Sequence, residues 1–417
     1  MRSGAERSKI AAEGLWEKRR GQLICTVAAD SMPMGYVVID SVVGGRSCGG
    51  LRMLPDIDEG EMRGLARAMT LKYGFLGLPQ GGAKAGVIGD PESSQKERSL
   101  RLKAFGRTIA PLLRSRAYIP GADMGTNNTD IRYMLGSVGV PVRPRELRGT
   151  DSGYYTALTV RAAAKRAAEH IGLPLSGCRV AIEGFGKVGS ALAGLLAEAN
   201  VRVVAISTLK GGVFNPKGLD VTRLTDLASK AGSRVVELYP EAERMDRAAL
   251  LELPVDLLCP CARHNSLHTD NAVRVKARII CPGANNPVTP EAEQMLFKQG
   301  VVCMPDFVTN CGGVLGGTMA FASVSQTRIA AFIDRHIGAR VEWVLNEAAR
   351  QGVLPREIAV RIAQRRFEQV QRDAEHPTAL GRLFNLALEL YRRGYIPGPL
   401  VATLSLPYFE RSLALCC

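Results

Sequence analysis

The chain has 417 residues, of which 46% are hydrophobic and 23% charged, and its formal net charge is +14. This length exceeds the roughly 250–300 residues at which one hydrophobic core stops growing, so we expect two domains in a globular protein of ordinary composition. Residues 1–21 contain no apolar run, and no later segment approaches the ~18 apolar residues of a membrane span. We therefore expect a cytoplasmic protein without a membrane partner.

The positive charge alone would suit a polyanion-binding module. Its arginines, however, are dispersed along expected helices such as 339–366 and do not form a block with interleaved aromatic residues, so we expect no nucleic-acid partner. Cysteines in apolar, strand-like runs are typical of small buried side chains in a reducing compartment. Four cysteines fit this description: Cys178, Cys259, Cys281 and Cys303.

Two further cysteine patterns bear on metal binding and on the C-terminus. Cys259 and Cys261 form a single C-x-C motif without a second pair at zinc-like spacing, so no metal site is expected. The terminal pair Cys416-Cys417 has no interpretation at this stage.

The first third of the chain contains helical and strand-like patterns in alternation. Residues 8–20 read as a helix, and enrichment in β-branched residues predicts strands over 22–28 and 35–43. Helical patterns follow over 59–76 and 95–116, separated by the glycine-rich stretch LGLPQGGAKAG.

The Pro-, Arg- and Gly-rich stretch 141–153 lies between two periodic regions and predicts a domain boundary. The elements expected beyond it have the spacing of βαβ units in a parallel sheet. They are a helix at 156–171, a strand at 178–183, a helix at 187–199, strands at 201–206, 255–259, 278–281 and 301–304, and helices over 325–395. We expect an α/β fold with domains over 1–150 and 151–325, and a helical segment, 326–417, that returns to the first domain.

A glycine-rich motif follows the strand expected at 178–183 and opens the next helix. Its glycines permit a tight turn, let the backbone approach a pyrophosphate and allow close packing of helix on strand, while the helix N-terminus supplies N–H donors. With the strand, the helix and the second strand all in place, the motif predicts dinucleotide binding. Its residues are Gly184, Phe185, Gly186, Lys187, Val188 and Gly189.

The coenzyme type is left open by the residues that follow the second strand. NAD-binding chains usually carry an acidic residue there, which holds the ribose 2′-hydroxyl. This chain has Thr208 and Lys210 instead, and Lys210 or Arg202 could pair with the 2′-phosphate of NADP. Alternatively, Lys210 is an exposed loop residue and NAD binds without the carboxylate.

Two lysines lie in an otherwise apolar, glycine-rich span, Lys72 in MTLKYG and Lys84 in PQGGAKAG. Burying an ammonium group without a partner is costly, so such lysines either face an anion or titrate at a lowered pKa. Asp123, in IPGADMGTNN, is a third candidate. From the residues alone it is either a turn-former or a catalytic carboxylate.

Together these motifs resemble a known family over roughly residues 35–320. Four motifs resemble the substrate domain of the amino-acid dehydrogenases that act on glutamate, leucine, phenylalanine and valine. They are GGLRM, MTLKYG, GLPQGGAKAG and IPGADMGTNNTDI. Six later motifs continue the resemblance in the family's order: SGYYTA, GFGKVGS, GGVFNPKGLD, PCARHN, GANNPVTPEA and PDFVTNCGGV. The first domain would then bind the substrate and form the oligomer, and the second would be a Rossmann-type NAD(P)-binding domain.

The resemblance implies a reaction and three central roles. A homo-oligomer would oxidise an L-amino acid with NAD or NADP, giving a 2-oxo acid and ammonia. Lys72 would hold the substrate α-carboxylate, Lys84 would activate the attacking water, and Asp123 would exchange protons with the amino group. Nearby Lys72 is expected to lower the pKa of Lys84 as a like charge.

The resemblance extends to further positions. Those expected to bind substrate are Gly49, Gly50, Met69, Asn310 and Gly317. Those expected to bind the coenzyme are Ser152, Gly184, Phe185, Gly186, Lys187, Val188, Gly189, Thr208, Lys210, Cys261, Ala262 and Asn285.

The expected substrate has an uncharged side chain. Glutamate-type members of this family carry a lysine, a glutamine and a serine at the positions of Cys48, Met69 and Gly317, and a pocket without the cation would leave a glutamate carboxylate unpaired. One alternative is a glutamate dehydrogenase in which Arg46 replaces that lysine. Another is a non-catalytic regulatory subunit of the same fold.

Overall fold

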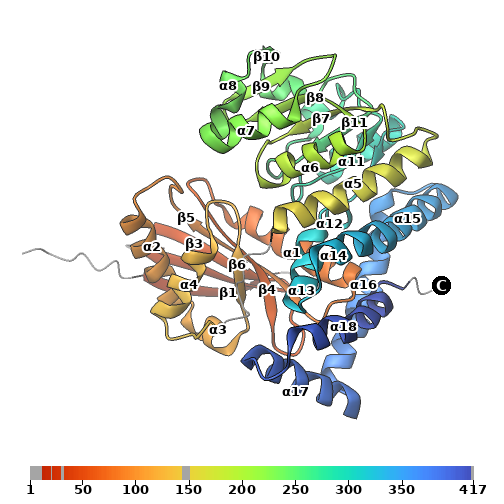
Figure 1. The fold of residues 1–417 in the computed structure, drawn as a ribbon. Coiled ribbons are helices and arrows are strands. Elements are labelled where there is room, and N and C mark those ends of the chain that lie inside the picture. The colour runs from red at the N-terminus through yellow and green to blue at the C-terminus, as the bar shows by residue number, and fades with distance from the viewer. Residues whose placement is uncertain (1–11, 20, 30–31, 143–150, 415–417) are drawn as a thin grey trace, which may run out of the picture. The chain divides into compact units, whose positions relative to one another are not determined.

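The computed structural model describes residues 12–19, 21–29, 32–142 and 151–414, so Cys416-Cys417 and most of the expected boundary at 141–153 lie outside it. The chain forms two compact units, each built on its own sheet (Figure 1). The first unit contains the described residues within Met1–Gly74, Leu78–Gly149 and Phe367–Tyr395. The second contains those within Phe75–Gly77, Thr150–Arg366 and Ile396–Cys417. This confirms the expected α/β fold class.

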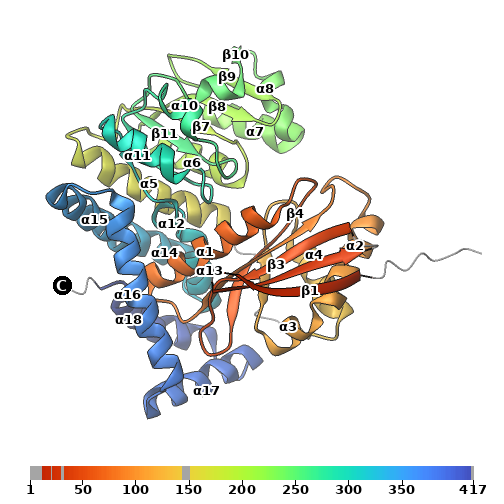
Figure 2. The ribbon, with the colours of Figure 1, turned by 180° about the vertical axis from the view of Figure 1, so that it is seen from behind.

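The first unit has a six-stranded mixed sheet in the order β1-β2-β3-β5-β4-β6. The pairs from β1 to β5 are antiparallel, whereas β4 runs parallel to both β5 and β6. Figure 2 shows the long strands β1 and β3 of this sheet. The strands are β1 (Ala12–Arg19), β2 (Gln22–Ala29), β3 (Met32–Ile39), β4 (Ser47–Leu54), β5 (Gly81–Ile88) and β6 (Ile119–Ala122).

Helices cover both faces of this sheet because its strands are apolar on both sides. Val37 and Ile39 pack toward α2, α3 and α4, whereas Val38 between them packs toward α1. The helices of the first unit are α1 (Glu59–Leu76, up to Gly74), α2 (Gln95–Thr108), α3 (Ala110–Ser115), α4 (Asn128–Ser137) and α17 (Ala379–Arg393).

Two expectations for this unit are wrong. Residues 8–20 read as a helix, but Ala12–Arg19 is the edge strand β1, paired with β2 from Ala12↔Ala29 to Arg19↔Gln22. Pairing with a neighbouring strand here outweighs a weak local helix preference. The single helix expected at 95–116 is two helices, because α2 ends before Ile109 and α3 begins anew with a proline in its first turn.

The second unit has a seven-stranded sheet in the order β10-β9-β8-β7-β11-β12-β13. The five strands from β8 to β13 are parallel, as the βαβ spacing predicts, and β9 and β10 add an antiparallel edge. The strands are β7 (Arg179–Glu183), β8 (Arg202–Thr208), β9 (Gly211–Phe214), β10 (Glu243–Met245), β11 (Leu257–Pro260), β12 (Ile279–Ile280) and β13 (Val302–Cys303).

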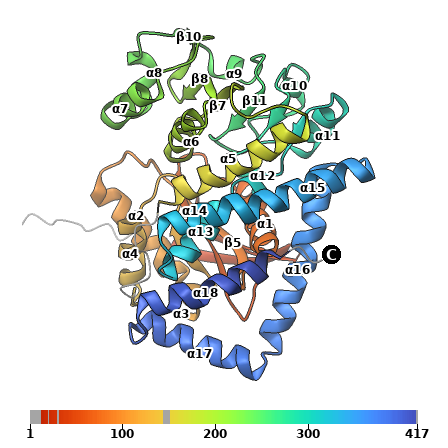
Figure 3. The ribbon, with the colours of Figure 1, turned by 45° about the vertical axis from the view of Figure 1, so that its right-hand side comes forward.

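Helices pack around this second sheet and extend beyond it. One face carries an apolar core shared with α9, α10 and α11, and Figure 3 shows α13 and α15 running beside the long buried helix α5. The helices are α5 (Ser152–His170), α6 (Lys187–Glu198), α7 (Val221–Ala231), η1 (Gly232–Arg234), α8 (Val235–Leu238), α9 (Arg247–Leu250), α10 (Thr269–Ala272), α11 (Pro290–Lys298), α12 (Asp306–Thr309), α13 (Gly312–Phe321), α14 (Gln326–Phe332), η2 (Ile333–Ile337), α15 (Gly338–Gln351), α16 (Pro355–Glu375) and α18 (Gly398–Leu413).

In the described ranges, no helix combines the length and the apolar character that crossing a membrane requires.

Four cysteines were expected to be buried, and the structure shows each of them as a buried free thiol: Cys178, Cys259, Cys281 and Cys303.

Candidate active site

Lys84 and Asp123 form an ion pair in the first unit. Lys84 lies in the middle of β5 with its side chain 3% exposed, and Asp123 follows the last residue of β6. Strand β4 lies between β5 and β6, so the two side chains meet across it. The Lys84 Nζ donates a hydrogen bond to Asp123 Oδ2. The structure therefore brings together two of the residues singled out in the sequence.

Two glycines on β4 leave room for this pair. A Cβ atom at Gly50 would lie 2.7 Å from Asp123 Oδ2, and one at Gly49 would lie 1.6 Å from the carbonyl oxygen of Ala83. A larger residue at Gly50 would displace the carboxylate, and one at Gly49 would separate β4 from β5. Both glycines, expected as substrate-binding positions, thus control how closely Asp123 and β5 approach β4.

Arg52 completes an ionic cluster around the pair. Its guanidinium donates to Glu61 and lies 3.6 Å from Asp123 Oδ1, with Arg52 4% exposed. Glu61 and Arg52 were not predicted to take part. One signal in the sequence could have pointed to Arg52: it lies within the strand-like motif GGLRM, where a buried cation requires a partner.

Burial and these neighbours shift both titratable groups of the pair. Burial lowers the pKa of Lys84, Asp123 opposes this shift, and Arg52 adds to it, a role for which the sequence pointed to Lys72. Burial acts to raise the pKa of the Asp123 carboxyl, but Lys84 and Arg52 outweigh it and hold that pKa below its usual range. At neutral pH Asp123 is ionised, and Lys84 loses its proton more readily than an exposed lysine.

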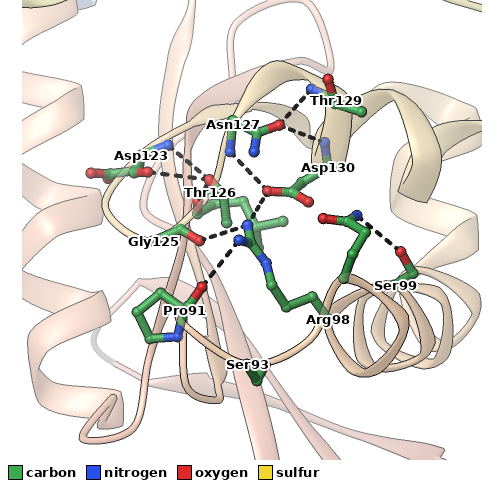
Figure 4. A network of polar contacts seen from close by, with 12 residues as sticks. Pro91, Ser93, Arg98, Ser99, Asp123, Gly125, Thr126, Asn127, Thr129 and Asp130 are labelled. Atoms are coloured by element: carbon green, nitrogen blue, oxygen red, sulfur yellow. Dashed lines mark hydrogen bonds and ion pairs between the residues drawn. The ribbon is translucent and has the colours of Figure 1, made fainter. Parts of the chain in front are cut away.

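The loop that carries Asp123 is held by side chains from neighbouring elements (Figure 4). The Thr126 hydroxyl accepts a hydrogen bond from the Asp123 backbone N–H at 3.0 Å and donates to the Leu51 carbonyl at 2.7 Å. Arg98 on α2 donates to the Gly125 carbonyl at 3.3 Å and pairs with the buried Asp130. These contacts fix the position of the carboxylate relative to β4.

Lys72 and Met69 lie on α1, which covers the other face of the sheet from α2. Lys72 is 4% exposed and Met69 is half-buried. A Cβ atom at Gly82 of β5 would lie 2.2 Å from the backbone nitrogen of Thr70, so this part of α1 approaches β5 closely. The helix therefore places Lys72 in the same unit as the ion pair, on an element that packs against β5, the strand of Lys84.

Cys48 lies beside two tyrosines on the strand that also carries Gly49 and Gly50. Its thiol is hydrogen-bonded to the hydroxyl of the buried Tyr73, and burial raises the pKa of Cys48. The hydroxyl of Tyr118, also buried, donates to the Gly49 carbonyl at 3.2 Å. Arg46 is exposed, and its backbone pairs with Val43 across a turn. Neither tyrosine was singled out in the sequence, where nothing distinguished them from ordinary core residues.

In the second unit, the motif predicted to bind a dinucleotide forms the turn between β7 and α6. Gly184 has φ +91°, which favours glycine, and a Cβ atom at Gly189 would lie 1.9 Å from the Gly184 carbonyl oxygen. A Cβ atom at Gly186 would have nothing within 4 Å, so this point of the turn is open. Gly186 is the N-cap of α6 and has no capping side chain. The turn from Gly184 to Gly189, with Phe185, Lys187 and Val188, thus fits a pyrophosphate.

Thr208 and Lys210 lie where β8 turns back into β9. The hairpin pairs Thr208 with Gly211, which leaves Lys210 exposed at its tip. The Thr208 hydroxyl donates to the Ser233 carbonyl at 2.6 Å and accepts from the Lys210 backbone N–H at 3.1 Å. Arg202 lies at the opposite end of β8 from Thr208 and Lys210.

Three loops surround the turn between β7 and α6. A Cβ atom at Gly184 would lie 2.8 Å from the Ala262 nitrogen, and one at Gly283 would lie 2.6 Å from Cys261 Sγ. Asn310 Nδ2 donates to Asn285 Oδ1 at 2.9 Å and to the Ala284 carbonyl at 2.8 Å. Asn310 is 3% exposed, and its Oδ1 has no hydrogen-bond partner in the described residues. Asn310 therefore fixes Asn285 and keeps one free acceptor.

Ser152 and Gly317 complete the predicted positions of the second unit. Ser152 is the exposed first residue of α5, next to Gly153, where a Cβ atom would lie 2.8 Å from the Lys187 carbonyl oxygen. The start of α5 thus approaches the start of α6. Gly317 is half-buried in α13.

Comparisons with known proteins match a family model in each half of the chain. Residues 150–373 match the family described as Glutamate/Leucine/Phenylalanine/Valine dehydrogenase. Residues 25–139 match the family described as Glu/Leu/Phe/Val dehydrogenase, dimerisation domain.

Individual relatives cover about two thirds of the chain. The chain is 35% identical to the glutamate dehydrogenase of Thermotoga maritima over 293 residues, 67% of this chain and 70% of that protein. It is 34% identical to an NAD-specific glutamate dehydrogenase of Staphylococcus aureus, with the same shares. It is also 34% identical to the NADP-specific enzyme of Saccharolobus shibatae, over 66% of this chain and 67% of that protein.

A solved structure extends the likeness. The hetero-hexameric glutamate dehydrogenase of Thermus thermophilus, in its Leu-bound form, is 27% identical to this chain with a TM-score of 0.72. The match covers 87% of this chain and 88% of that one.

Proposed function

We propose that this chain, which belongs to the glutamate/leucine/phenylalanine/valine dehydrogenase family, oxidises an L-amino acid with an uncharged side chain to its 2-oxo acid and ammonia, reversibly. That it is an amino-acid dehydrogenase follows from the family. The substrate class and the residue roles are our proposal. The observation that carries it is the buried ion pair of Lys84 with Asp123.

Lys84 acts as the base toward water in this proposal. The coenzyme supplies the hydride acceptor for the hydrogen on the substrate α-carbon. The neutral amine of Lys84 then takes a proton from the water that adds to the resulting imine carbon. Its lowered pKa makes that neutral form accessible, and burial keeps the amine away from bulk water.

Asp123 and Lys72 orient the substrate around this step. Asp123, ionised at neutral pH, accepts a hydrogen bond from the substrate amino group and relays its protons until the nitrogen leaves as ammonia. Lys72 on α1 pairs with the α-carboxylate and so fixes the direction of the α-carbon. Arg52, which is itself paired with Glu61, holds Asp123 in place.

The coenzyme is NAD or NADP, since named relatives include enzymes specific for each. Gly184 to Gly189 hold the pyrophosphate, and Asn285 and Asn310 hold the nicotinamide half, where the free Oδ1 of Asn310 accepts from a carboxamide N–H. Ser152, Cys261 and Ala262 border the same turn. Lys210, exposed at the β8–β9 tip, pairs with the 2′-phosphate of NADP.

The position of Cys48 supports an uncharged substrate side chain. A glutamate side chain would require a cation to replace the water that solvates its carboxylate. Glutamate-type members of the family carry a lysine at this position, whereas the Cys48 thiol is hydrogen-bonded to the uncharged hydroxyl of Tyr73. Met69, on α1 of the same unit, adds an apolar side chain.

A second candidate is a glutamate dehydrogenase with Arg46 as the side-chain anchor. It is favoured by the names of the three relatives above. In the structure Arg46 is exposed and its backbone is tied into a turn, so it would have to change rotamer to reach a buried carboxylate.

One assay tests these proposals. The purified chain is mixed with each of the twenty L-amino acids and with NAD or NADP, and formation of the reduced coenzyme is followed by absorbance. We expect turnover, with kcat/KM for leucine, valine, phenylalanine or tryptophan above that for glutamate. A higher kcat/KM for glutamate would contradict the substrate class and point to Arg46. No turnover with any pair would contradict the dehydrogenase activity.

We further propose a cytoplasmic homo-oligomer that binds no nucleic acid. The match of residues 25–139 to a dimerisation domain supports the assembly. Sedimentation of the purified chain should give a mass that is a multiple of 44.9 kDa. A monomer at micromolar concentration would contradict it.

A further inference from the structure

A second ionic cluster lies in the second unit. Its Asp306 belongs to the motif PDFVTNCGGV, but none of its charged residues was predicted to bind substrate or coenzyme. Arg356 on α16 donates to the carboxylates of Glu293 on α11 and Asp306 at the start of α12, the latter at 3.0 Å. Both carboxylates are only 1% exposed. The Arg356 guanidinium also lies 5.9 Å from the centre of the Phe307 ring.

Asp306 connects this cluster to the loop that holds Asn285. Its second oxygen, Oδ2, accepts a hydrogen bond from the backbone N–H of Asn286 at 3.0 Å. Asn286 has φ +49°, a conformation that few residues adopt without external support. The Asp306 carbonyl also accepts from the Asn310 N–H at 2.8 Å, and Asn310 in turn donates to Asn285. Asp306 thus contacts Asn286, the residue after Asn285, and Asn310, which is hydrogen-bonded to Asn285.

The position of Asp306 depends on Arg356. Burial raises the pKa of Glu293, and the neighbouring Asp306 raises it further, whereas Arg356 lowers it. Arg356 contacts both carboxylates. Without Arg356, two buried carboxylates would lie side by side without this cation, and the position of Asp306 and its support of Asn286 would change.

We propose that Arg356 is a positioning residue for coenzyme binding, which holds Asp306 so that the loop Gly283-Ala284-Asn285-Asn286-Pro287 is in place for the nicotinamide half. This rests on the proposed function. Arg356 touches no coenzyme atom itself and acts through Asp306 and Asn286. The adenosine diphosphate half, whose pyrophosphate is held at the turn from Gly184 to Gly189, does not depend on it.

The test compares two probes on Arg356→Met. NADH and NADPH carry the nicotinamide half, whereas ADP carries only the adenosine and diphosphate. We expect the dissociation constant of the coenzyme that the parent binds to rise about 10-fold, or ~1.4 kcal/mol. The dissociation constant of ADP should stay within about twofold of the parent. Both are measured by fluorescence or calorimetric titration well below the melting temperature.

Three further variants separate positioning from general stability. Glu293→Gln keeps the contact of Arg356 with Asp306 and should bind the coenzyme like the parent, even if it melts earlier. Arg356→Lys should recover part of the lost affinity. Arg365→Met, an exposed arginine on the same helix, should bind both probes like the parent.

Three results would overturn the inference. They are parent-like coenzyme binding by Arg356→Met, equal weakening of both probes, and weakening by Glu293→Gln as large as that by Arg356→Met. If Arg356→Met does not fold, Asp306→Asn takes its place with the same expectations and the same overturning results. A parent that binds neither NADH nor NADPH would instead overturn the proposed function, and this inference with it.

Discussion

Each unit of this molecule holds an arginine between two ion-paired carboxylates, and the cluster of the first unit contains one further residue, Lys84. In the first unit Arg52 contacts Glu61 and Asp123, and Lys84 joins as a second cation. In the second unit Arg356 contacts Glu293 and Asp306. A buried lysine can lose its proton, whereas a guanidinium stays charged at any working pH.

This difference gives the two clusters different proposed roles, acid–base catalysis for the first and support of a loop for the second. In the first cluster burial lowers the pKa of Lys84, and a group that exchanges protons is what acid–base catalysis requires. In the second cluster a permanent cation holds a loop through Asp306, and no proton needs to move. Changes to the first cluster should therefore affect turnover, and changes to the second should affect binding.

The largest effect is expected from Lys84→Met, which keeps the volume of the side chain and removes its amine. Turnover should fall by ~10²–10⁴, the range typical of a lost acid–base group, because the amine that pairs with Asp123 is removed. Coenzyme affinity should be unchanged. Steady-state rates and coenzyme titration check both. Lys96→Met, at an exposed lysine, is the control. Activity within a few-fold of the parent would remove Lys84 from the mechanism.

Asp123→Asn should follow, with turnover lower by about 10²-fold or more. The amide accepts a hydrogen bond from the substrate amino group but cannot carry its proton. The same rate assay measures the loss. The amide has the shape of the carboxylate, so coenzyme binding should persist. Turnover close to that of the parent would show that Asp123 only supports Lys84.

Lys210→Met leaves both clusters intact and tests coenzyme choice alone. We expect kcat/KM for NADP to fall about 10-fold, since an ammonium that pairs with a phosphate is lost, and kcat/KM for NAD to stay within about twofold. Lys217→Met is the control, because Lys217 is also exposed but lies after the end of β9, away from the β8–β9 tip. If the parent already rejects NADP by a hundredfold, Lys210 is not a phosphate ligand.

The smallest effect is a shift in pH dependence that has opposite signs for two variants. Activity that needs the neutral amine rises with pH through the pKa of Lys84. Arg52 lowers this pKa and Glu61 raises it. Arg52→Gln should therefore move the rising limb of kcat/KM to higher pH, and Glu61→Gln should move it to lower pH, each by about one unit or less. Shifts in the same direction in the measured profiles would contradict the electrostatic account.

Features with local signals could be predicted from the sequence. The glycine turn at Gly184 to Gly189 needs one strand, one helix and a few residues between them, and all of these are contiguous in the chain. Lys84 and Asp123 could be named as candidates because each interrupts an apolar or glycine-rich run. Their role as a pair could not, because β4 brings them together and the pairing of strands is not local.

Features that depend on tertiary partners could not be predicted. β1 carries a sequence that also suits a helix, and only its pairing with β2 decides between the two. Arg356 is one of many arginines in the C-terminal helices, and nothing in its neighbours distinguishes it from the exposed Arg365. The carboxylates that distinguish it, Glu293 and Asp306, are 63 and 50 residues away along the chain.

The place of β5 in its sheet has a consequence for how the molecule fluctuates. β5 lies between β3 and β4, and seven of its eight residues are buried, whereas β1 is an edge strand with one neighbour. Local opening of a sheet begins at its margins, so backbone amides of β5 should exchange with solvent only when the whole unit opens. Fraying of β1 would then leave Lys84 in register with its neighbours, and the Lys84 amine would stay beside Asp123 through motions that repeatedly expose the edge strand.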